Sequence, residues 1–470
     1  MPDRSRTRRG HPASLVPFCG LLAAMVGLSP EAQAYSTYYA NLHSHCILSD
    51  GIGTPDEAFT HARDVANIDV LALTDHTHLL TSTEFNTLLT KAQQYTQDGV
   101  FVALGCQEFG ILNDFGHINI FDAAFRNPNP TEDLTGCYSF ILSQGAFGSF
   151  NHPNPSYGSF FNNLTYYPQY ADAMRAIEVV NGLANGDYQT QWIQALNNGW
   201  KLGPFANQDN HQGNWGDQEN TDNGGDIYLT GILADGLTKN DILGALRARR
   251  FFAMEIDPPN DRMELEFSCS GQPMGSEITT GTGPTFTVTA RAINGTTLFN
   301  RIEIWRDGVL FHTKVMIGNQ ITYNWQDFLS DGESHYYFAK VQQVDQDRAW
   351  SAPIWVTAEV APTDAPEQAV RREEFTLLPS YPNPALPSVE LRFLLPHRSG
   401  DEPYRLSLTV HDVNGRLVRD LGSRLLSGGQ HTWTWDGNDD QGRSVASGVY
   451  LYRVHGEGLP ERSARVVVLN

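Results

Sequence analysis

The stretch NLHSHCILSDG, residues 41–51, ends one apolar run and begins a loop. His43 and His45 are two residues apart, so on a strand both side chains point to the same face. Asp50 follows five residues after His45. A single His-x-His pair occurs by chance about as often as it marks a metal site. Its assignment as a metal site therefore depends on further metal-ligating side chains at equivalent places along the chain.

Seven short apolar runs occur between about residues 36 and 255, and helix-like segments separate several of them. The helix signals include two capping boxes, Thr54 with Glu57 and Thr81 with Glu84, and cations that close the segment 237–250. Apolar runs joined by helices are typical of strands buried on both faces of a mainly parallel sheet. The sequence therefore predicts such a sheet with about seven strands.

The other candidate ligands lie at the ends of these apolar runs. His76 closes the second run, Glu108 the third, His152 the fifth, and Asp209 and His211 the seventh, whereas His117 opens the fourth. In a β/α barrel the carboxyl ends of the strands form one rim, so these side chains would converge there. His117 fits this argument less well because it precedes its run.

Six histidines and three carboxylates favour zinc, manganese or iron over magnesium. Nine ligands are too many for one ion, so two or three divalent metal ions are predicted, with Glu108 placed to bridge them. Such ions generate hydroxide from bound water near neutral pH and stabilise charge on a substrate oxygen. We therefore predict a hydrolase that uses a metal-bound hydroxide, with Glu108, Asp209 and His211 as catalytic residues.

The motifs NLHSH, SDG, LTDH, GCQEFG, GHINIF, NHP and NQDNH occur in this order between about residues 40 and 255. The series resembles the polymerase-and-histidinol-phosphatase (PHP) family of metal-dependent hydrolases. The resemblance implies a distorted seven-stranded β/α barrel with a trinuclear metal site, and it supports His117 as a ligand. It implies one metal on His43, His45, Glu108 and Asp209, a second on Glu108, His117 and His152, and a third on Asp50, His76 and His211.

Within that family, the segments DNHQGNWGD, LTKNDILGALRARRFFAMEID and RAWSAPIWV are similar to the secreted, carbaryl-hydrolase-like branch. In that branch a small β-sandwich follows the barrel. Helix patterns disappear after about residue 260, and alternating runs with Asp-Gly turns appear. We predict a barrel at 35–260, a β-sandwich domain at 261–360, a Pro-rich charged linker at 361–374 and an Ig-like domain at 375–470.

The predicted domain at 375–470 resembles the Ig-like domain of flagellar hook-capping proteins and the C-terminal sorting domains of type IX secretion. The resemblance implies attachment to a cell surface or contact with a secretion machinery. The last residues, SARVVVLN, lack the Lys-rich close common in sorting domains.

Residues 1–34 have the three parts of a secretory signal peptide: arginines, a short apolar stretch and a small-x-small cleavage site at 32–34. We expect bacterial export to the periplasm, the cell surface or the medium, with no transmembrane segment. Export permits disulfides among Cys46, Cys106, Cys137 and Cys269, with buried free thiols as the alternative. The formal net charge of -21 argues against nucleic acid as a partner.

The substrate is predicted to be a small-molecule ester, and two features bear on its class. Aromatic residues crowd the segment 155–170 after His152, where they form either a stacking wall or ordinary loop packing. Cations are scarce: between residues 43 and 237 the chain has only Arg63, Lys91, Arg126, Arg175 and Lys201. Selection of polyanionic phosphates usually needs Arg clamps, so a carboxylic or carbamic ester is the alternative to a phosphoester. A non-catalytic surface-binding protein is the alternative of another class.

Overall fold

The computed structural model of this 470-residue chain falls into two compact units, Met1–Ala361 and Pro362–Asn470. The residues that it describes are 35–110, 115–130, 132–156, 160–182, 186–217, 227–256, 262–293, 297–359, 375–381, 385, 388–396, 398 and 402–468. The predicted signal peptide, 1–34, and the predicted linker, 361–374, lie outside these ranges. Among the described residues, no helix is both long enough and apolar enough to cross a membrane.

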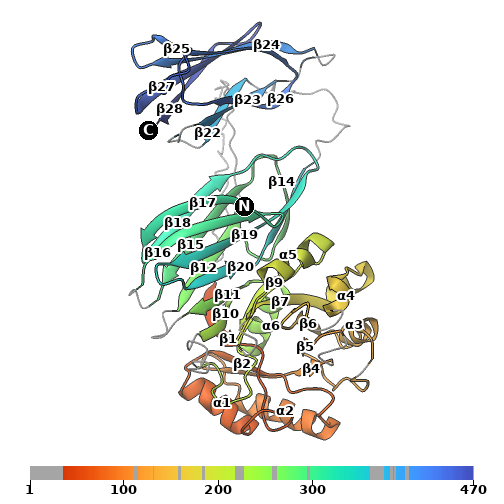
Figure 1. Ribbon diagram of the computed structural model, residues 1–470. Coiled ribbons are helices and arrows are strands. Elements are labelled where there is room, and N and C mark those ends of the chain that lie inside the picture. Colours follow the sequence, from red (N-terminus) through yellow and green to blue (C-terminus); the bar gives the residue numbers. More distant parts are fainter. Residues whose placement is uncertain are drawn as a thin grey trace, which may run out of the picture. The chain divides into compact units, whose positions relative to one another are not determined.

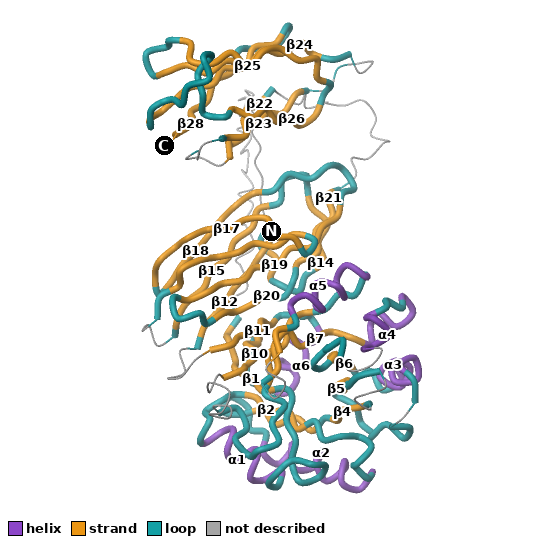
Figure 2. Tube along the Cα trace, viewed as in Figure 1, coloured by secondary structure: helices purple, strands orange, loops and turns teal. Residues whose placement is uncertain are grey.

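The largest sheet of the first unit has eleven strands, drawn in Figures 1 and 2. Nine of its strands follow one another in the order β14 (Glu277–Thr280), β21 (Ile354–Ala358), β19 (Ser334–Gln343), β20 (Arg348–Ser351), β11 (Phe251–Ile256), β10 (Ile227–Ala234), β1 (Ser36–Asn41), β2 (Val70–Leu73) and β3 (Val102–Gly105). The other two lie off this path: β16 (Phe299–Arg306) pairs with β19, and β17 (Val309–Gly318) pairs with β16. The β1–β2–β3 part is parallel, as predicted, and its side chains are mostly buried on both faces except in the first half of β1.

A second sheet of six strands belongs to the same unit. Its members are β4 (Gln107–Phe109), β5 (Ile118–Phe121), β6 (Phe147–Phe150), β7 (Met174–Asn181) and β8 (Gly186–Asp187) in this order, with β9 (Gly203–Asn207) also paired to β7. Strands β6, β7 and β9 are parallel, whereas β5 is antiparallel to both β4 and β6. The strands thus lie in two sheets, and the ladders do not define a single seven-stranded β/α barrel.

Two isolated bridges connect these two sheets. His76, beyond the end of β2, pairs with Glu108 in β4, and Ser44, beyond the end of β1, pairs with Asn210 beyond β9. Backbone hydrogen bonds accompany the bridges, from Thr77 N to Glu108 O (2.7 Å) and from His45 N to Asn210 O (2.8 Å). The two sheets therefore meet at the residues that the sequence marks as ligands.

The helices of the first unit cover these sheets (Figure 1). They are α1 (Pro55–Asp64), α2 (Ser82–Tyr95), α3 (Leu134–Ser143), α4 (Phe160–Leu164), the 3₁₀ segment η1 (Pro168–Ala173), α5 (Gln189–Asn198) and α6 (Lys239–Arg247). Both predicted capping boxes are confirmed, since Thr54 accepts from Glu57 N and Thr81 from Glu84 N while each glutamate bonds back. α5 ends at Gly199, whose φ of 112° places it in the left-handed region that glycine adopts readily.

The predicted sandwich segment is continuous with the first sheet. β20 pairs antiparallel with β11, so that Ala253 lies opposite Trp350 and both are fully buried. A further sheet consists of β13 (Gln272–Pro273), β12 (Met263–Cys269), β15 (Thr285–Ala292) and β18 (Gln320–Gln326). One compact unit therefore contains both predicted segments, 35–260 and 261–360.

The second unit is all β within the residues described. One sheet has β22 (Thr376–Tyr381), β23 (Val389–Leu395) and β26 (Gly429–Trp435), and the other has β25 (Leu417–Leu426), β24 (Tyr404–Asp412), β27 (Gly448–Gly456) and β28 (Arg462–Val468). The predicted Asn-Gly hairpin is confirmed as the turn between β24 and β25. Alternating side chains of both sheets, including Trp433, Trp435 and Tyr452, form its core.

Candidate metal centre

All nine predicted ligands lie at the edge where the two sheets meet. His43 and His45 follow β1, and their Nε2 atoms both lie 3.3 Å from Asp209 Oδ1. This common partner confirms that the His-x-His pair presents both rings to one face. Asp209 and His211 follow β9, and the peptide N–H of Asp209 donates to His43 O (3.0 Å).

The position of His117 follows from the direction of β5. Because β5 runs antiparallel to β4 and β6, its first residues lie at the same edge as the last residues of its neighbours. His117 immediately precedes β5, and its Nδ1 lies 3.2 Å from Glu108 Oε1. A mainly parallel arrangement could not account for this ligand, and the antiparallel strand does.

The carboxylate of Glu108 is the centre of the group. Five histidine nitrogens surround it, at 3.1 Å for His43 Nε2, 3.4 Å for His45 Nε2, 3.0 Å for His76 Nδ1, 3.2 Å for His117 Nδ1 and 3.6 Å for His152 Nε2. Asn151 Nδ2 donates to Oε1 as well, at 2.7 Å. Glu108 is 1% exposed, so these neighbours replace water around its charge.

Asp50 closes the outer side of the group. Its oxygens lie 3.4 Å from His211 Nε2, 3.6 Å from His76 Nε2 and 4.0 Å from His45 Nδ1. Its side chain is 48% exposed, whereas those of His43 and His45 are fully buried. The group is therefore buried on the β1 side and opens to solvent beside Asp50.

Although the rings of His43, His45 and His76 approach Glu108 to 3.0–3.4 Å, five buried polar atoms of this group make no hydrogen bond. Four are imidazole nitrogens, His43 Nε2, both ring nitrogens of His45 and His76 Nδ1, and one is a carboxylate oxygen, Glu108 Oε2. Polar atoms buried without a partner are costly, and five in one place call for a ligand that satisfies them together. Imidazole nitrogens and carboxylate oxygens are the donors that zinc, manganese and iron take. The residues present therefore fit divalent transition metals.

The charges in the group favour cations. Burial opposes protonation of His43, but the carboxylates of Asp209, Glu108 and Glu178 outweigh it and hold the pKa of that imidazole well above its usual value. Burial would raise the pKa of Glu108, yet neighbouring imidazoles, His117 foremost, hold it well below its usual range. The pKa of Asp209 is lowered against burial in the same way, chiefly by His43. Ionised carboxylates are the form that ligates a metal.

Seven of the nine candidate ligands, all except His152 and Asp209, form three overlapping groups, and the ligand atoms of each group lie within 4.8 Å of one another. The groups are His43, His45 and Glu108; His76, Glu108 and His117; and His45, Asp50, His76 and His211. The first and third resemble two of the three ligand sets implied by the family. In the second, His76 takes the place expected for His152, whose Nε2 is farther from Glu108. The division among individual ions stays a prediction.

Glu178, in β7, holds the buried side of the centre. Its Oε1 lies 2.9 Å from His43 Nδ1 and accepts from Asn207 Nδ2 at 3.1 Å. Its Oε2 accepts from His152 N at 2.7 Å and from Asn181 Nδ2 at 2.8 Å. A carboxylate on one nitrogen fixes the tautomer of a histidine and frees the other nitrogen for a metal. Glu178 is thus an inner hydrogen-bonding residue and not one of the nine candidate ligands.

We expect Glu178→Gln to lower metal affinity or activity about 10- to 100-fold, the range for partners of metal-binding histidines. The amide can keep the bond to His43, but its NH₂ group cannot accept from His152 N or Asn181. Metal titration of this variant checks the prediction, with Glu266→Gln on the exposed side of β12 as the control. Unchanged affinity and activity would show that Glu178 only fills space.

The loop that carries Asp50 is fixed from beneath by Asp75. Asp75 Oδ1 accepts from Cys46 N (3.0 Å) and Ser49 Oγ (2.7 Å), and its Oδ2 accepts from Cys46 Sγ (3.1 Å). Gly51 makes the loop's close approach possible, because a Cβ there would lie 2.6 Å from the carbonyl carbon of His45. Asp75 therefore orders the loop, and Gly51 leaves it room.

We expect Gly51→Ala to lower the free energy of unfolding by about 1–3 kcal/mol, the usual cost of forcing an atom into packed space. The backbone of His45 cannot yield without moving its ring, so metal binding weakens as well. Thermal melts with and without metal check this. Gly244→Ala is the matched control, because a Cβ there meets nothing within 4 Å and alanine favours the interior of helix α6. Equal melting of both variants would contradict the close contact.

Two candidate ligands have positive φ values, 27° for His152 and 56° for Asp209. Such conformations are unfavourable for a residue with a Cβ and persist where the surrounding structure enforces them, often at functional sites.

Trp215, which the sequence analysis did not identify, supports the backbone of a candidate ligand: its Nε1 donates to His45 O (2.9 Å), and the residue is 3% exposed. Only its position six residues after Asp209 could have indicated it.

The predicted aromatic wall is mostly core. Phe160 and Phe161 are 6% and 1% exposed, and the tyrosines at 166, 167 and 170 pack partly buried against the same cluster. A Cβ on Gly116 would lie 2.7 Å from the ring of Phe161, so this ring supports the backbone beside His117. Tyr157 lies outside the described residues. Ordinary packing, the alternative stated above, accounts for the described aromatics.

The four described cysteines, Cys46, Cys106, Cys137 and Cys269, are free and buried. Cys46 donates to Asp75, and Cys106 lies in a different apolar cluster. Burial raises the pKa of the Cys106 thiol to about 12, which keeps it protonated and unreactive. The alternative of buried thiols therefore holds, and no disulfide joins the described cysteines.

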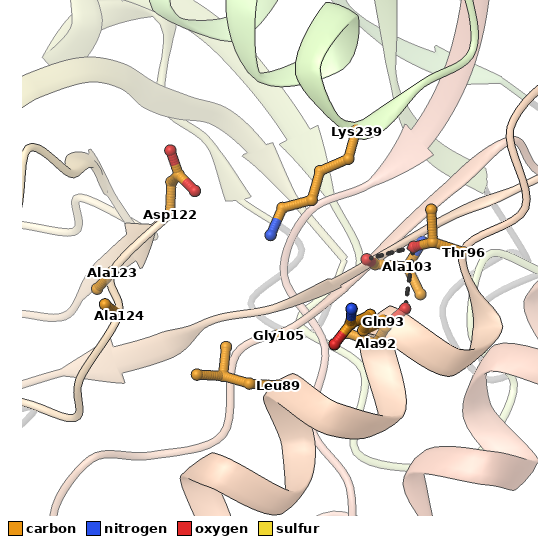
Figure 3. A pocket seen from close by; sticks show the side chains of 10 residues that line it. All are labelled: Leu89, Ala92, Gln93, Thr96, Ala103, Gly105, Asp122, Ala123, Ala124 and Lys239. Carbon is orange, nitrogen blue, oxygen red and sulfur yellow. Dashed lines mark hydrogen bonds between the residues drawn. The ribbon is translucent and has the colours of Figure 1, made fainter.

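A cavity of about 450 Å³ lies away from the metal ligands. Residues of α2 and β3, among them Leu89, Ala92 and Gly105, line it together with Asp122 and Lys239 from other parts of the chain (Figure 3). None of the nine candidate ligands lines this cavity. The cavity is therefore distinct from the candidate metal centre.

Comparisons with known proteins bear on the two units separately. Residues 401–458 match the family of FlgD Ig-like domains, which confirms the Ig-like character predicted for the C-terminal region. An uncharacterized protein of Chlamydia pneumoniae is 32% identical over 142 residues, and one of Chlamydia muridarum is 28% identical over 142 residues. Both matches cover 27% of this chain and 22% of the relative, so the chain spans about a fifth of the length of these relatives.

Two solved structures are similar to parts of the chain. One is a two-domain protein from Bacteroides vulgatus containing a predicted PHP-like metal-dependent phosphoesterase; it is 18% identical, with a TM-score of 0.41, and the match covers 70% of this chain and 97% of that one. The other is dimeric latent PorU from Porphyromonas gingivalis, 16% identical with a TM-score of 0.19, covering 52% and 24%. Similarities this low transfer no function by themselves.

Proposed function

We propose that the first unit is a metal-dependent hydrolase of small esters, a phosphoesterase in the first place. We further propose that it belongs to the PHP family, in the secreted carbaryl-hydrolase-like branch, and that its two sheets are that family's distorted barrel. The observation that carries the proposal is the convergence of six imidazoles and three carboxylates with unpartnered buried donors around Glu108.

The proposal assigns two or three divalent ions to the nine ligands. Bound there, such ions lower the pKa of water and act as Lewis acids on a substrate oxygen. The chain's own part is to hold the site in place. Glu178 orients His43, Asn151 orients Glu108, and Asp75 orders the loop that brings Asp50 to the open side.

The arrangement favours catalysis over a structural role. Structural metal sites are normally closed and use four ligands, whereas this group has nine candidate ligands and an exposed side at Asp50. The other ligands are buried except the partly exposed His211, and burial strengthens electrostatic interactions with a reacting group. A non-catalytic binding protein would need neither the ligand excess nor the opening.

The test is hydrolysis by the full chain reloaded with zinc, manganese or iron in turn. We expect turnover of bis(4-nitrophenyl) phosphate that disappears with chelator and returns when metal is restored. The panel includes 4-nitrophenyl phosphate and 4-nitrophenyl acetate. Lack of metal-dependent turnover on every substrate would overturn the proposal.

A carboxylic or carbamic ester hydrolase is the second candidate, and one observation favours it. The loops at the open side of the centre contain a single cation, Arg126, whose Nη1 donates to the backbone oxygen of Thr77 at 3.0 Å. Polyanionic phosphates are usually held by several arginines. Faster metal-dependent cleavage of the acetate than of either phosphate would favour this candidate.

We also propose that the chain is exported, with residues 1–34 removed, and that the unit containing the FlgD Ig-like match serves attachment or sorting. The signal-peptide pattern and the resemblance of residues 375–470 to sorting domains support this. Mass spectrometry of the protein from its native host tests it. A mature chain that retains residues 1–34 inside the cell would contradict export.

A further inference from the structure

The open side of the metal centre is bordered by exposed apolar side chains. Ile47 is 62% exposed, Ile52 59%, Leu79 47% and Phe125 66%. We call these four residues the apolar rim. Among described residues 35–256, only three other large apolar side chains are exposed to a comparable degree: Val65, Val100 and Leu142. Exposed apolar surface is therefore concentrated in the loops next to the ligands.

Backbone contacts tie the rim to the centre. The peptide N–H of Ile52 donates to His211 O at 3.1 Å, and that of Leu79 donates to His76 O at 3.0 Å. Ile47 lies in the same loop as Asp50, where its N–H donates to Gly53 O at 2.7 Å. The main chain at Ile52 and Leu79 is therefore held to ligand residues, and that at Ile47 is held within the loop that carries Asp50.

Phe125 is tied to the centre by a different route. Its carbonyl oxygen accepts from the side chain of Gln107, the residue before Glu108, at 3.0 Å. The next residue, Arg126, donates to the carbonyl oxygen of Thr77, the residue after His76. Phe125 thus belongs to the same edge although it lies in the loop after β5.

The rim has little positive charge. The loops 46–53, 76–81, 122–127, 152–156 and 208–217 contain one lysine or arginine, Arg126, and its guanidinium already holds Thr77. A substrate with several negative charges would therefore have only the bound ions to neutralise it. Exposed apolar side chains beside a catalytic opening instead favour burial of apolar substrate surface.

We propose that the apolar rim makes this site selective for esters that carry an apolar group, such as a phenyl ring, and at most one negative charge. This inference rests on the proposed hydrolase function and names its substrate class. One face of a phenyl ring against the rim stabilises the complex enough to favour it about tenfold over a methyl group. The rim contacts a part of the substrate that does not react, so its effect falls mainly on KM.

Two substrates with the same leaving group test the selectivity. These are phenyl 4-nitrophenyl phosphate and methyl 4-nitrophenyl phosphate, assayed with the metal-loaded full chain. We expect kcat/KM to favour the phenyl diester about tenfold. Ile52→Ser and Phe125→Ser should each reduce this ratio at least about threefold, chiefly through KM. Val65→Ser and Val100→Ser are matched controls, because these exposed valines precede β2 and β3 at the opposite ends of the strands.

Binding of methylphenylphosphinate and dimethylphosphinate, which each carry one negative charge and no ester bond, is measured by calorimetry and gives a readout that needs no turnover. Preferential binding of methylphenylphosphinate that both rim variants lose, without turnover of any ester, would overturn the hydrolase and leave the rim's selectivity standing. Turnover with equal rates for the two diesters would overturn the rim's selectivity and leave the hydrolase standing. A phenyl preference that both rim variants retain would also overturn it.

Discussion

Glu108→Gln is expected to reduce turnover about a thousandfold or more, the scale of losing one strongly stabilising polar group in an active site. Glu108 is the centre of the ligand group, since five histidine nitrogens lie around its oxygens and it is 1% exposed. The substitution keeps the shape and removes the negative charge that balances the ions. Metal content should fall with activity.

The fold should survive this substitution, because glutamine keeps the size and shape of glutamate at position 108. Circular dichroism and thermal melting of the variant check this. Glu264→Gln, which removes a partly exposed carboxylate paired with Arg291 far from the candidate ligands in the sequence, is the control and should keep full activity. Near-normal rates in Glu108→Gln would refute its central role. Asp209→Asn is expected to behave in the same way.

A chain of residues 35–256 is expected not to fold, whereas a chain of residues 35–361 is expected to fold and remain active. β11 pairs with β20 along Phe252–Glu255, and Phe252, Met254 and Ile256 are fully buried in a cluster that also holds residues from β12, β19 and β20. Three such side chains contribute about 5–9 kcal/mol, which is comparable with the whole stability of a domain. The segment beyond 361 belongs to a separate compact unit and supplies no candidate ligand.

Soluble yield, limited proteolysis and thermal melting of the two chains test this. The longer chain should melt cooperatively, and its rate constants should match those of the full chain. A cooperative transition in the shorter chain would show that the residues after 256 are an independent domain. Loss of activity in the longer chain, with metal still bound, would show that the second unit helps to build the site.

The ligands could be predicted from the sequence because their signals are local. A histidine or carboxylate at the end of an apolar run is visible in the sequence, and the rule that neighbouring strand ends share an edge brings such residues together. The two capping boxes were predictable for the same reason, since Thr54 and Thr81 contact residues only three positions away.

Long-range pairing could not be predicted in this way. Nothing local indicates that β5 runs antiparallel to its neighbours, although this direction is what places His117 beside Glu108. The pairing of β11 with β20 joins residues almost a hundred positions apart, so no local signal could reveal that the segments before and after residue 260 share a sheet. Burial of Phe161 depends on Gly116, a contact between distant loops.

Some interactions of the site could not be predicted from the sequence for another reason. The hydrogen-bonding roles of Glu178 and Trp215 depend on which partner each side chain meets, and neither follows from residue type. Solvent exposure, too, does not follow from residue type, since nothing in the sequence distinguishes the aromatic residues after His152 from the apolar residues near Asp50. The former are largely buried, and the latter are exposed at the site.

The most direct test of the multinuclear centre is elemental analysis of the full chain, purified without chelator and then reloaded with zinc, manganese or iron. Nine converging ligands with unpartnered buried donors predict at least two equivalents of these metals per chain. One equivalent or none after reloading would contradict the multinuclear site.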